Sequence, residues 1–271
     1  MKILFIGGGN MASAMIGGLI ARGEAATEIG VVELNEEARQ GLATRFGVQT
    51  FADGTDVVGL AQAVVLAVKP QQLRNVALAL GSNVSSQVVI SIAAGIRLAD
   101  LSRWLGGHQK LVRAMPNTPA LIRAGVTGLF ALPAVDAAAR TLTESLMSAI
   151  GSWFWVSDEA MMDSVTAVSG SGPAYAFYFM EAMEAGALQS GFDAQSARQM
   201  ALDTVLGAAR LAAEGGEPFA VLRQRVTSKG GTTEAALNAM NQAGVAEGVI
   251  AGMHAAEARG RELGEQLGRD A

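Results

Sequence analysis

Cysteine is absent from this 271-residue sequence, and histidine occurs only twice, as His108 and His254. The lack of thiols excludes disulfides, iron–sulfur clusters, thiolate zinc sites and cysteine nucleophiles. The two histidines lie far apart in the sequence, so we expect surface or packing residues rather than a metal-binding pair. We therefore predict no metal site.

Charged residues and proline are also scarce. Charged residues make up 17% of the chain, with 20 basic and 25 acidic side chains, a net charge of −5 and no basic block. This balance argues against a nucleic-acid partner. Half of the residues are hydrophobic, which excludes a disordered chain. There are 6 prolines but 33 glycines, so the fold must need glycine at particular places.

No charge occurs between Lys2 and Arg22, a stretch long enough to resemble a membrane span or a signal peptide. The string IGGGN interrupts this stretch, and no cleavage site follows it. A buried strand, a glycine-rich turn and an apolar helix explain the composition better. We therefore expect no membrane partner and, because nothing marks export, a cytoplasmic location.

Residues 1–158 alternate between short apolar runs and helical patterns. Continuous apolar runs such as KILFIG are typical of strands buried on both faces of a parallel sheet. The expected strands are 2–7, 28–34, 63–70, 87–95, 111–119, 127–132 and 152–157, and the expected helices are 11–22, 35–47 and 135–150. The alternation predicts an α/β domain with a doubly wound parallel sheet.

Residues 159–271 carry almost no strand signal, which predicts an all-helical domain. Pro173 stands where a helix would begin, Asp193 can cap the next helix, and Gly215–Gly216 can end it. Shorter helices are expected around 218–226 and 233–240.

The last expected helix carries a narrow apolar stripe. Its members recur in steps of three and four and are Val245, Val249, Met253, Ala256, Gly260, Leu263 and Leu267. Such a stripe can face its own domain or pack on a second subunit, and the pattern alone favours neither.

Gly7, Gly9 and Ala12 form a G-x-G-x-x-A string between the first strand and the first helix. Gly7 permits a tight turn, Gly9 lets a pyrophosphate approach the backbone, and Ala12 lets the helix lie close to the strand. The amides and the dipole at the helix start favour a phosphate group. The string predicts a dinucleotide site in a Rossmann-type domain.

Glu33 ends the second strand, where an acidic residue often binds the ribose 2′-hydroxyl of NAD. It can equally be a solvated charge at a strand end. Facing the ribose, it would repel the 2′-phosphate of NADP unless it turned away. Asn35 and Arg39 lie nearby, so NADPH and NADH both stay candidates.

Six segments occur in a characteristic order: FIGGGNMASAMIGGL, AVKP, SIAAG, MPNTPA, AVSGSGPAY and VTSKGGTTEAAL. Together they resemble the pyrroline-5-carboxylate reductase family. The resemblance implies hydride transfer from NADPH or NADH to the C=N bond of 1-pyrroline-5-carboxylate, which gives L-proline. It also implies a homodimer formed through the helical domain, and dimers that can assemble further.

The resemblance also implies a cofactor site, to which the strand pattern adds Glu33. The expected cofactor residues are Ile6, Gly7, Gly8, Gly9, Asn10, Met11, Glu33, Ala67, Val68, Lys69, Pro70, Ile92, Ala93, Ala94 and Asn117. Asp53–Gly54 stand where the family often has an asparagine close to the cofactor.

The loop TSKGGTT matches the substrate loop of the family. The expected substrate residues are Ser228, Gly231, Thr232 and Thr233. Thr233 is the candidate to hydrogen-bond the ring nitrogen of the imine. Taken alone, the loop also fits an ordinary threonine helix cap, and both roles can coexist. Lys69 is the second catalytic candidate as a general acid, or else it only contacts ribose or nicotinamide.

Two other classes of protein share parts of this pattern. Related two-domain dehydrogenases that act on β-hydroxy acids or other imines commonly use a lysine on a helix of the second domain, but the segment YAFYFMEAMEAG after SGSGP contains none. A regulatory nucleotide-binding protein would keep the glycine loop without needing TSKGGTT.

Ser169 and Ser171 have no nearby histidine to activate them, so we expect structural or lining roles. Glu181 and Glu184 are expected on a solvated helix face.

Overall fold

A computed structural model describes residues 1–269, which divide into two compact units. Residues 1–171 and the chain from Ala255 onward form the nucleotide unit, and residues 172–254 form the helical unit. The predicted boundary after residue 158 stays a prediction. Of the helices in residues 1–269, none is both long enough and apolar enough to span a membrane.

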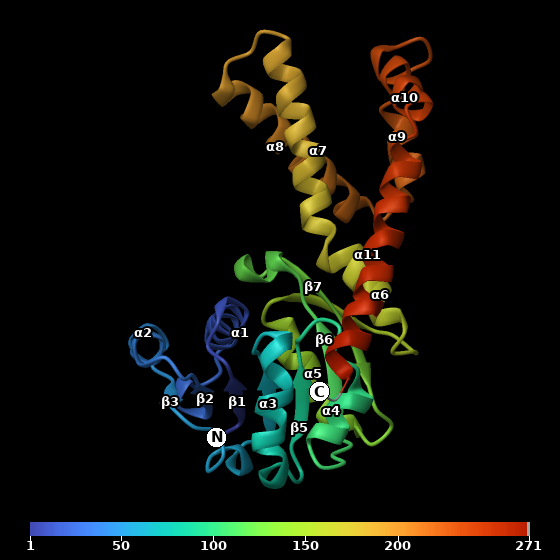
Figure 1. The fold of residues 1–271 in the computed structure, drawn as a ribbon. Coiled ribbons are helices and arrows are strands. Elements are labelled where there is room, and N and C mark those ends of the chain that lie inside the picture. The colour runs from blue at the N-terminus through green and yellow to red at the C-terminus, as the bar shows by residue number, and fades with distance from the viewer. Residues whose placement is uncertain (270–271) are drawn as a thin grey trace. The chain divides into compact units, whose positions relative to one another are not determined.

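The nucleotide unit is built on one eight-stranded sheet of order β3-β2-β1-β4-β5-β6-β7-β8 (Figure 1). Its strands are β1 (Ile3–Ile6), β2 (Ile29–Val32), β3 (Gln49–Phe51), β4 (Ala63–Leu66), β5 (Val88–Ser91), β6 (Leu111–Met115), β7 (Gly125–Ala131) and β8 (Gly151–Trp155). The first six follow the Rossmann order, with the reversal between β1 and β4. The predicted fold is therefore confirmed.

One strand departs from the expected parallel sheet, because β7 runs antiparallel to β6. The connection between them, residues 116–124, is too short for the crossover that a parallel pair needs. It holds only the 3₁₀ turn Thr118–Ile122. The strand β8 pairs parallel to β7 after a full helical connection. The three-residue β3 was not expected, since no apolar run marks it.

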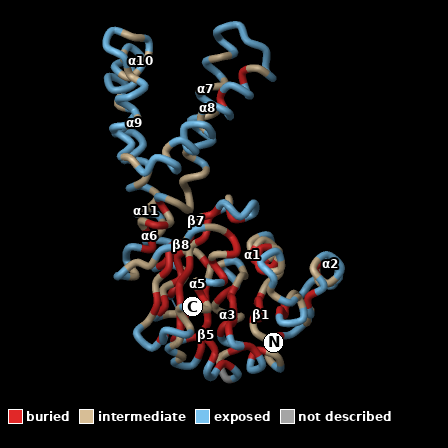
Figure 2. Tube along the Cα trace, turned by 180° about the vertical axis from the view of Figure 1, so that it is seen from behind, coloured by how far each residue is buried: buried red, intermediate tan, exposed pale blue. Residues whose placement is uncertain are grey.

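Helices cover both faces of the sheet. The helices of this unit are α1 (Asn10–Ala21), α2 (Glu36–Phe46), α3 (Pro70–Leu80), α4 (Leu98–Trp104), α5 (Ala137–Ser148) and α6 (Met161–Val165), followed by a π-helical turn (Thr166–Gly170). One core joins α1, α2 and α5 to one face, and a second core joins α3 and α4 to the other. Between these two cores, the strands β1, β2, β4 and β5 are buried along their whole length, and Figure 2 shows buried residues in red.

The helical unit contains α7 (Gly172–Gln189), α8 (Ala194–Gly215), α9 (Phe219–Arg225) and α10 (Thr232–Gln242). The predicted start and the predicted end of α8 are both confirmed. The Asp193 carboxylate accepts a hydrogen bond from the Ser196 amide at 2.9 Å, and Gly216 ends α8 with φ of +62°. No strand follows Trp155 within the described chain, as the sequence predicts.

The final helix, α11 (Val245–Gly268), begins in the helical unit and continues in the nucleotide unit. Near its end Gly264 lies so close to Gly95 that an added Cβ would come within 2.5 Å of the Gly95 carbonyl oxygen, and Leu267 packs against the core. At its start Val245 and Val249 are exposed. The C-terminal turns of the helix, with Leu267 of the stripe, thus pack within the nucleotide unit and not within the helical domain expected over 159–271, whereas the described residues leave Val245 and Val249 exposed.

Candidate active site

A cavity of about 580 Å³ opens where the carboxyl ends of β1, β2 and β4 meet. This is the edge at which open α/β sheets bind ligands, beside the point where the strand order reverses. The cavity is lined by Ile6, Gly7, Val32, Glu33, Leu34, Ala52, Asp53, Gly54, Thr55, Val68, Gln71, Gln72, Asn75, Val76, Ala79 and Leu80.

Gly7 and Gly9 shape the loop beside this cavity. Gly7 has φ of +101°, and a Cβ there would lie 2.8 Å from the Ala67 carbonyl oxygen, so this turn requires glycine. Gly9 is the N-cap of α1, and an added Cβ would meet no atom within 4 Å. The backbone at Gly9 is therefore open to a ligand.

The start of α1 is an available anion site. No side chain caps the helix, and no acidic residue stands in its first turn. Its first amides are thus left for a ligand, and the helix dipole adds to their attraction for a phosphate. Ala12 is buried, which lets α1 lie close to the sheet. These features fit the pyrophosphate of a dinucleotide.

Glu33 follows β2 and is neither free nor simply solvated. Its Oε2 accepts a hydrogen bond from the Gly8 amide at 3.0 Å, and its Oε1 accepts one from the Asn35 amide at 3.0 Å. Arg39 donates to the carbonyl oxygens of Glu33 at 2.7 Å and Leu34 at 2.8 Å. The carboxylate is thereby held at the wall of the cavity.

Asp53 brings a second carboxylate to the same wall. Its Oδ1 accepts hydrogen bonds from the Thr55 amide at 2.9 Å and the Thr55 hydroxyl at 3.0 Å. The Thr55 amide, and then the Thr55 hydroxyl, hold the pKa of Asp53 below its usual value. Asp53 is therefore an anion at neutral pH.

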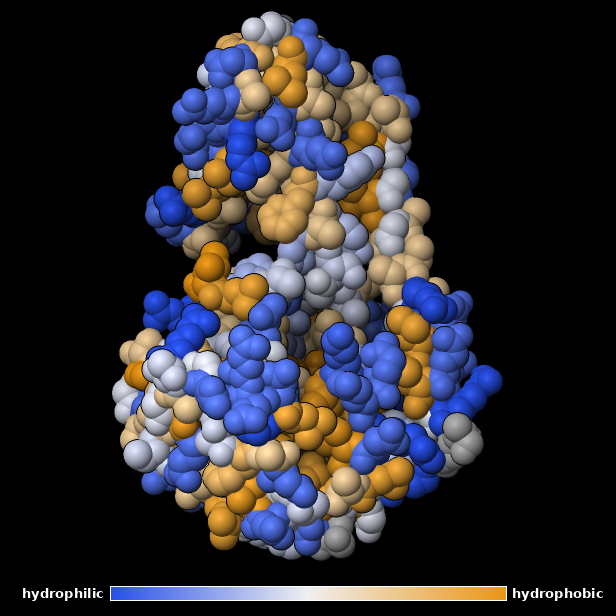
Figure 3. Space-filling view, turned by 60° about the vertical axis from the view of Figure 1, so that its left-hand side comes forward, coloured by the Kyte–Doolittle hydropathy of each residue, from blue (hydrophilic) through white to orange (hydrophobic). Residues whose placement is uncertain are grey.

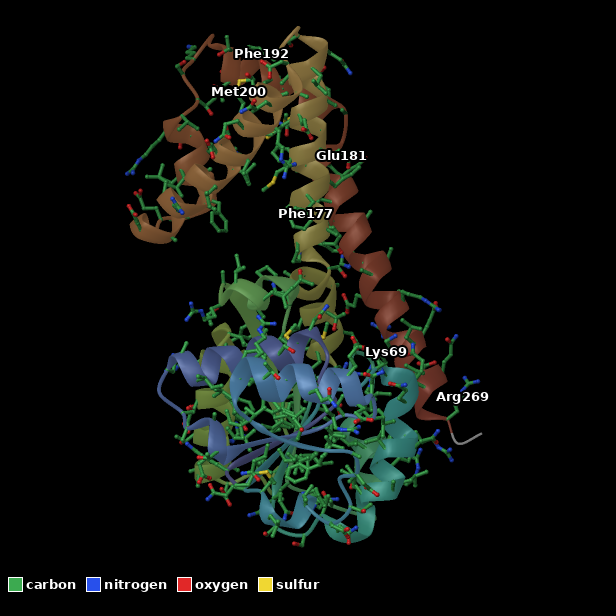
Figure 4. All side chains as sticks on the ribbon, turned by 90° about the vertical axis from the view of Figure 1, so that its left-hand side faces the viewer. Lys69, Phe177, Glu181, Phe192, Met200 and Arg269 are labelled. Carbon is green, nitrogen blue, oxygen red and sulfur yellow. The ribbon has the colours of Figure 1, made fainter. Side chains whose placement is uncertain are left out.

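The turns after β4 and β5 lie at the same sheet edge. Lys69, labelled in Figure 4, is the exposed N-cap residue of α3. Pro70 takes the first helical position. The Ile92 amide donates to the Leu66 carbonyl at 3.2 Å, which joins the β5 turn to the end of β4. Of the predicted cofactor residues, Ile6, Gly7, Glu33 and Val68 line the cavity.

Asn117 is buried and already serves as a structural link. Its side-chain amide donates to the Ser169 carbonyl at 3.1 Å, and its oxygen accepts from the Val126 amide at 2.9 Å. The Ser169 hydroxyl donates to the Val165 carbonyl at 2.8 Å within the π-helical turn. Cofactor contact by Asn117 stays a prediction.

The predicted substrate residues form a compact turn in the helical unit. Gly231, not a threonine, is the N-cap of α10, and no side chain caps this helix. Glu234 instead accepts a hydrogen bond from the Gly230 amide at 2.7 Å. The interpretation of this loop as a threonine cap is therefore wrong, since Thr232 and Thr233 lie inside the first turn and keep their hydroxyls for other partners.

Sequence reasoning missed much of the cavity wall. Gln71, Gln72 and Asn75 reach it from α3, a helix that the sequence analysis did not predict. The sequence analysis placed Pro70 at the end of a strand and in the cofactor site, although proline also favours the first position of a helix. That position was the signal that could have revealed α3.

Two family models match the chain. Residues 2–95 match the model described as NADP oxidoreductase coenzyme F420-dependent. Residues 159–263 match the model described as pyrroline-5-carboxylate reductase dimerisation.

Individual relatives match nearly the whole chain. A pyrroline-5-carboxylate reductase of Pseudomonas aeruginosa is 44% identical over 269 residues, covering 99% of this chain and 98% of the relative. The solved pyrroline-5-carboxylate reductase of Coxiella burnetii is 42% identical with a TM-score of 0.92, covering 97% of this chain and 98% of that one. The solved Plasmodium falciparum pyrroline carboxylate reductase with NADP bound has a TM-score of 0.86 and covers 97% of this chain and 98% of its own. At 23% identity, this similarity shows the fold alone.

Proposed function

The chain belongs to the pyrroline-5-carboxylate reductase family, and from this premise we propose that it reduces 1-pyrroline-5-carboxylate to L-proline with NADPH or NADH. The observation that carries the proposal is the 44% identity to such a reductase over 99% of the chain. The cavity beside the uncapped start of α1 supports the use of a dinucleotide. The reaction is the last step of proline biosynthesis.

Reduction of an imine requires a hydride at carbon and a proton at nitrogen. A bound reduced nicotinamide supplies the hydride. Because a protonated imine is already electrophilic, the main task of the protein is to orient the ring. The glycine loop and the start of α1 would hold the pyrophosphate, and the turns after β4 and β5 would border the nicotinamide.

The substrate carboxylate needs hydrogen-bond donors. Ser228 and Thr232 offer hydroxyls at the start of α10, where a carboxylate is favoured by the helix dipole. Gly231, whose own amide donates to the Ser228 carbonyl at 3.0 Å, lies directly beside the Ser228 hydroxyl. The Thr233 hydroxyl is the proposed partner of the ring nitrogen. It can take this role because it does not cap its own helix.

Lys69 is the second proposed catalytic residue. It is exposed, and no hydrogen bond or ion pair to its side chain is found among residues 1–269. Its ammonium group is therefore free to donate a proton or to contact the ribose or the nicotinamide. Lys69→Met should change the dependence of kcat/KM on pH if Lys69 donates the proton, and should leave that dependence unchanged if Lys69 only contacts the cofactor.

We also propose a homodimer formed through the helical domain. Large apolar side chains stand exposed on this unit, among them Phe177 at 65%, Tyr178 at 76% and Phe219 at 81%. Figure 3 shows apolar side chains between polar ones on the surface of these helices. An apolar surface of this kind is typical of an interface between subunits. We also propose a cytoplasmic location, because the reductase would use the NADPH or NADH of the cell.

The test is a direct assay of the full-length protein. Mixed with 1-pyrroline-5-carboxylate, it should oxidise NADPH or NADH, followed by loss of the absorbance of the reduced nicotinamide. Thr233→Ala should lower kcat/KM at least tenfold and leave dinucleotide binding unchanged, and Thr233→Ser should restore most of the activity. Binding of a dinucleotide without any oxidation by the wild type would overturn the proposed reaction and favour other imines or hydroxy acids.

A further inference from the structure

NADPH and NADH differ only at the adenosine ribose. NADPH carries a 2′-phosphate, which is an anion and mainly an acceptor of hydrogen bonds. NADH has a hydroxyl there, which can donate. The charge of the cavity wall therefore decides which of the two a protein binds more tightly.

The cavity wall at the ends of β2 and β3 carries two carboxylates, Glu33 and Asp53. None of the described residues that line the cavity is a lysine or an arginine. A 2′-phosphate entering this cavity would meet like charges with no cation in the lining to balance them.

Glu33 does not have the freedom to turn away from a ligand. Two backbone amides, those of Gly8 and Asn35, each hold one of its oxygens at 3.0 Å. These amides belong to the phosphate loop and to the β2–α2 turn, so they fix the carboxylate between them. Each carboxylate oxygen keeps a second lone pair, which can accept a hydrogen bond from a ribose hydroxyl.

Arg39 is the cation nearest in sequence, and its guanidinium has another task. Its Nη1 donates to the backbone carbonyls of Glu33 and Leu34. These bonds hold the arginine against the β2–α2 turn, and it does not belong to the cavity lining.

We propose that Glu33 and Asp53 make this chain select NADH over NADPH. Glu33 accepts hydrogen bonds from the ribose hydroxyls, and the two carboxylates together repel a 2′-phosphate. The inference rests on the proposed function, because it concerns the cofactor of that reductase.

The test is a pair of binding titrations on the full-length protein, with NADH and NADPH as probes and nicotinamide fluorescence as the readout. The wild type should bind NADH at least tenfold more tightly than NADPH. Glu33→Gln, which keeps the shape and removes the charge, should reduce this ratio at least fivefold, and Asp53→Asn should reduce it by a smaller factor. Glu36→Gln is the matched control, because Glu36 is an exposed acid on α2 outside the cavity, and its ratio should equal that of the wild type.

Equal or tighter binding of NADPH by the wild type would overturn the inference. So would a Glu33→Gln protein of normal melting temperature with an unchanged ratio, or an Arg39→Ala protein that loses affinity for NADPH alone. If Glu33→Gln does not fold, the ratio of NADH affinity to NADPH affinity is measured in Asp53→Asn instead. An unchanged ratio in that variant would overturn the inference. Failure of the proposed function looks different, because it would abolish oxidation in the presence of substrate while the two binding constants stayed measurable.

Discussion

Gly7 and Gly9 stand two residues apart in one loop, yet their conformations and surroundings differ. At Gly7 the backbone has φ of +101°, and the Ala67 carbonyl leaves no room for a side chain. At Gly9 the backbone has φ of −67°, which any residue can adopt, and the space in front of it is empty. The first glycine is required by the fold, and the second stands where we expect the pyrophosphate to approach the backbone.

Alanine substitutions at these two positions should separate the two requirements. Gly7→Ala should lower the free energy of unfolding by about 1–3 kcal/mol, because it forces a strained φ. Gly9→Ala should change it by less than about 0.5 kcal/mol. It should nevertheless weaken NADH binding at least tenfold, since its methyl group lies where the pyrophosphate approaches. Denaturant unfolding and fluorescence titration measure the two effects, and normal NADH binding by Gly9→Ala would contradict this assignment.

At the scale of elements, a buried ionic cluster joins segments that are distant in sequence. Arg113 on β6 and Asp163 on α6 are only 2% and 3% exposed and form an ion pair of 3.3 Å. Arg97, before α4, pairs with the same carboxylate, and Glu159 accepts a hydrogen bond from the Leu98 amide at 2.7 Å. Burial lowers the pKa of the Arg113 guanidinium, and the Glu159 charge is the chief opposing influence.

Asp163→Ala should lower the free energy of unfolding by about 3–5 kcal/mol, because the buried Arg113 guanidinium loses its buried partner and keeps only Glu159, at 3.4 Å. The control is Glu262→Ala, which removes an exposed ion pair with Arg259 and should cost less than about 1 kcal/mol. Urea denaturation of the two variants measures the difference. Equal free energies of unfolding in the two variants would show that the ionic cluster does not hold these elements together.

The cap of α8 predicts a pH effect on stability. The Ser196 amide, followed by the Ser196 hydroxyl, holds the pKa of Asp193 below its ordinary value of 3.8. Because the folded pKa is the lower one, the cap contributes its full stability above pH 3.8 and loses it as the pH falls through the folded pKa. Asp193→Asn should therefore remove part of the difference in melting temperature between pH 6 and pH 3. An unchanged difference would exclude Asp193 as a contributor.

At the scale of the whole molecule, the exposed apolar residues of the helical unit predict its assembly. Phe177→Asp should shift the protein from dimer toward monomer, because a charge would be buried in the proposed interface. Leu60→Asp is the control, since Leu60 is 67% exposed on the nucleotide unit. Light scattering after size exclusion gives both masses. A dimer that persists in Phe177→Asp would place the interface elsewhere.

The sequence by itself determined the features that depend on neighbouring residues. The turn at Gly7, the Asp193 cap, the end of α8 at Gly216 and the buried β1 strand all follow from local sterics and apolar pattern. The order of the six family segments added the expected substrate loop, which no local rule could have assigned to an imine.

Only the tertiary structure decided which distant residues meet. It turned β7 antiparallel, joined Asp53 and Glu33 in one cavity wall, and paired Arg113 with Asp163. It also showed that the Gly8 amide holds Glu33, which settles whether that carboxylate is free to turn. Such contacts depend on strand order and on the distances between chain segments, and one-dimensional patterns carry neither.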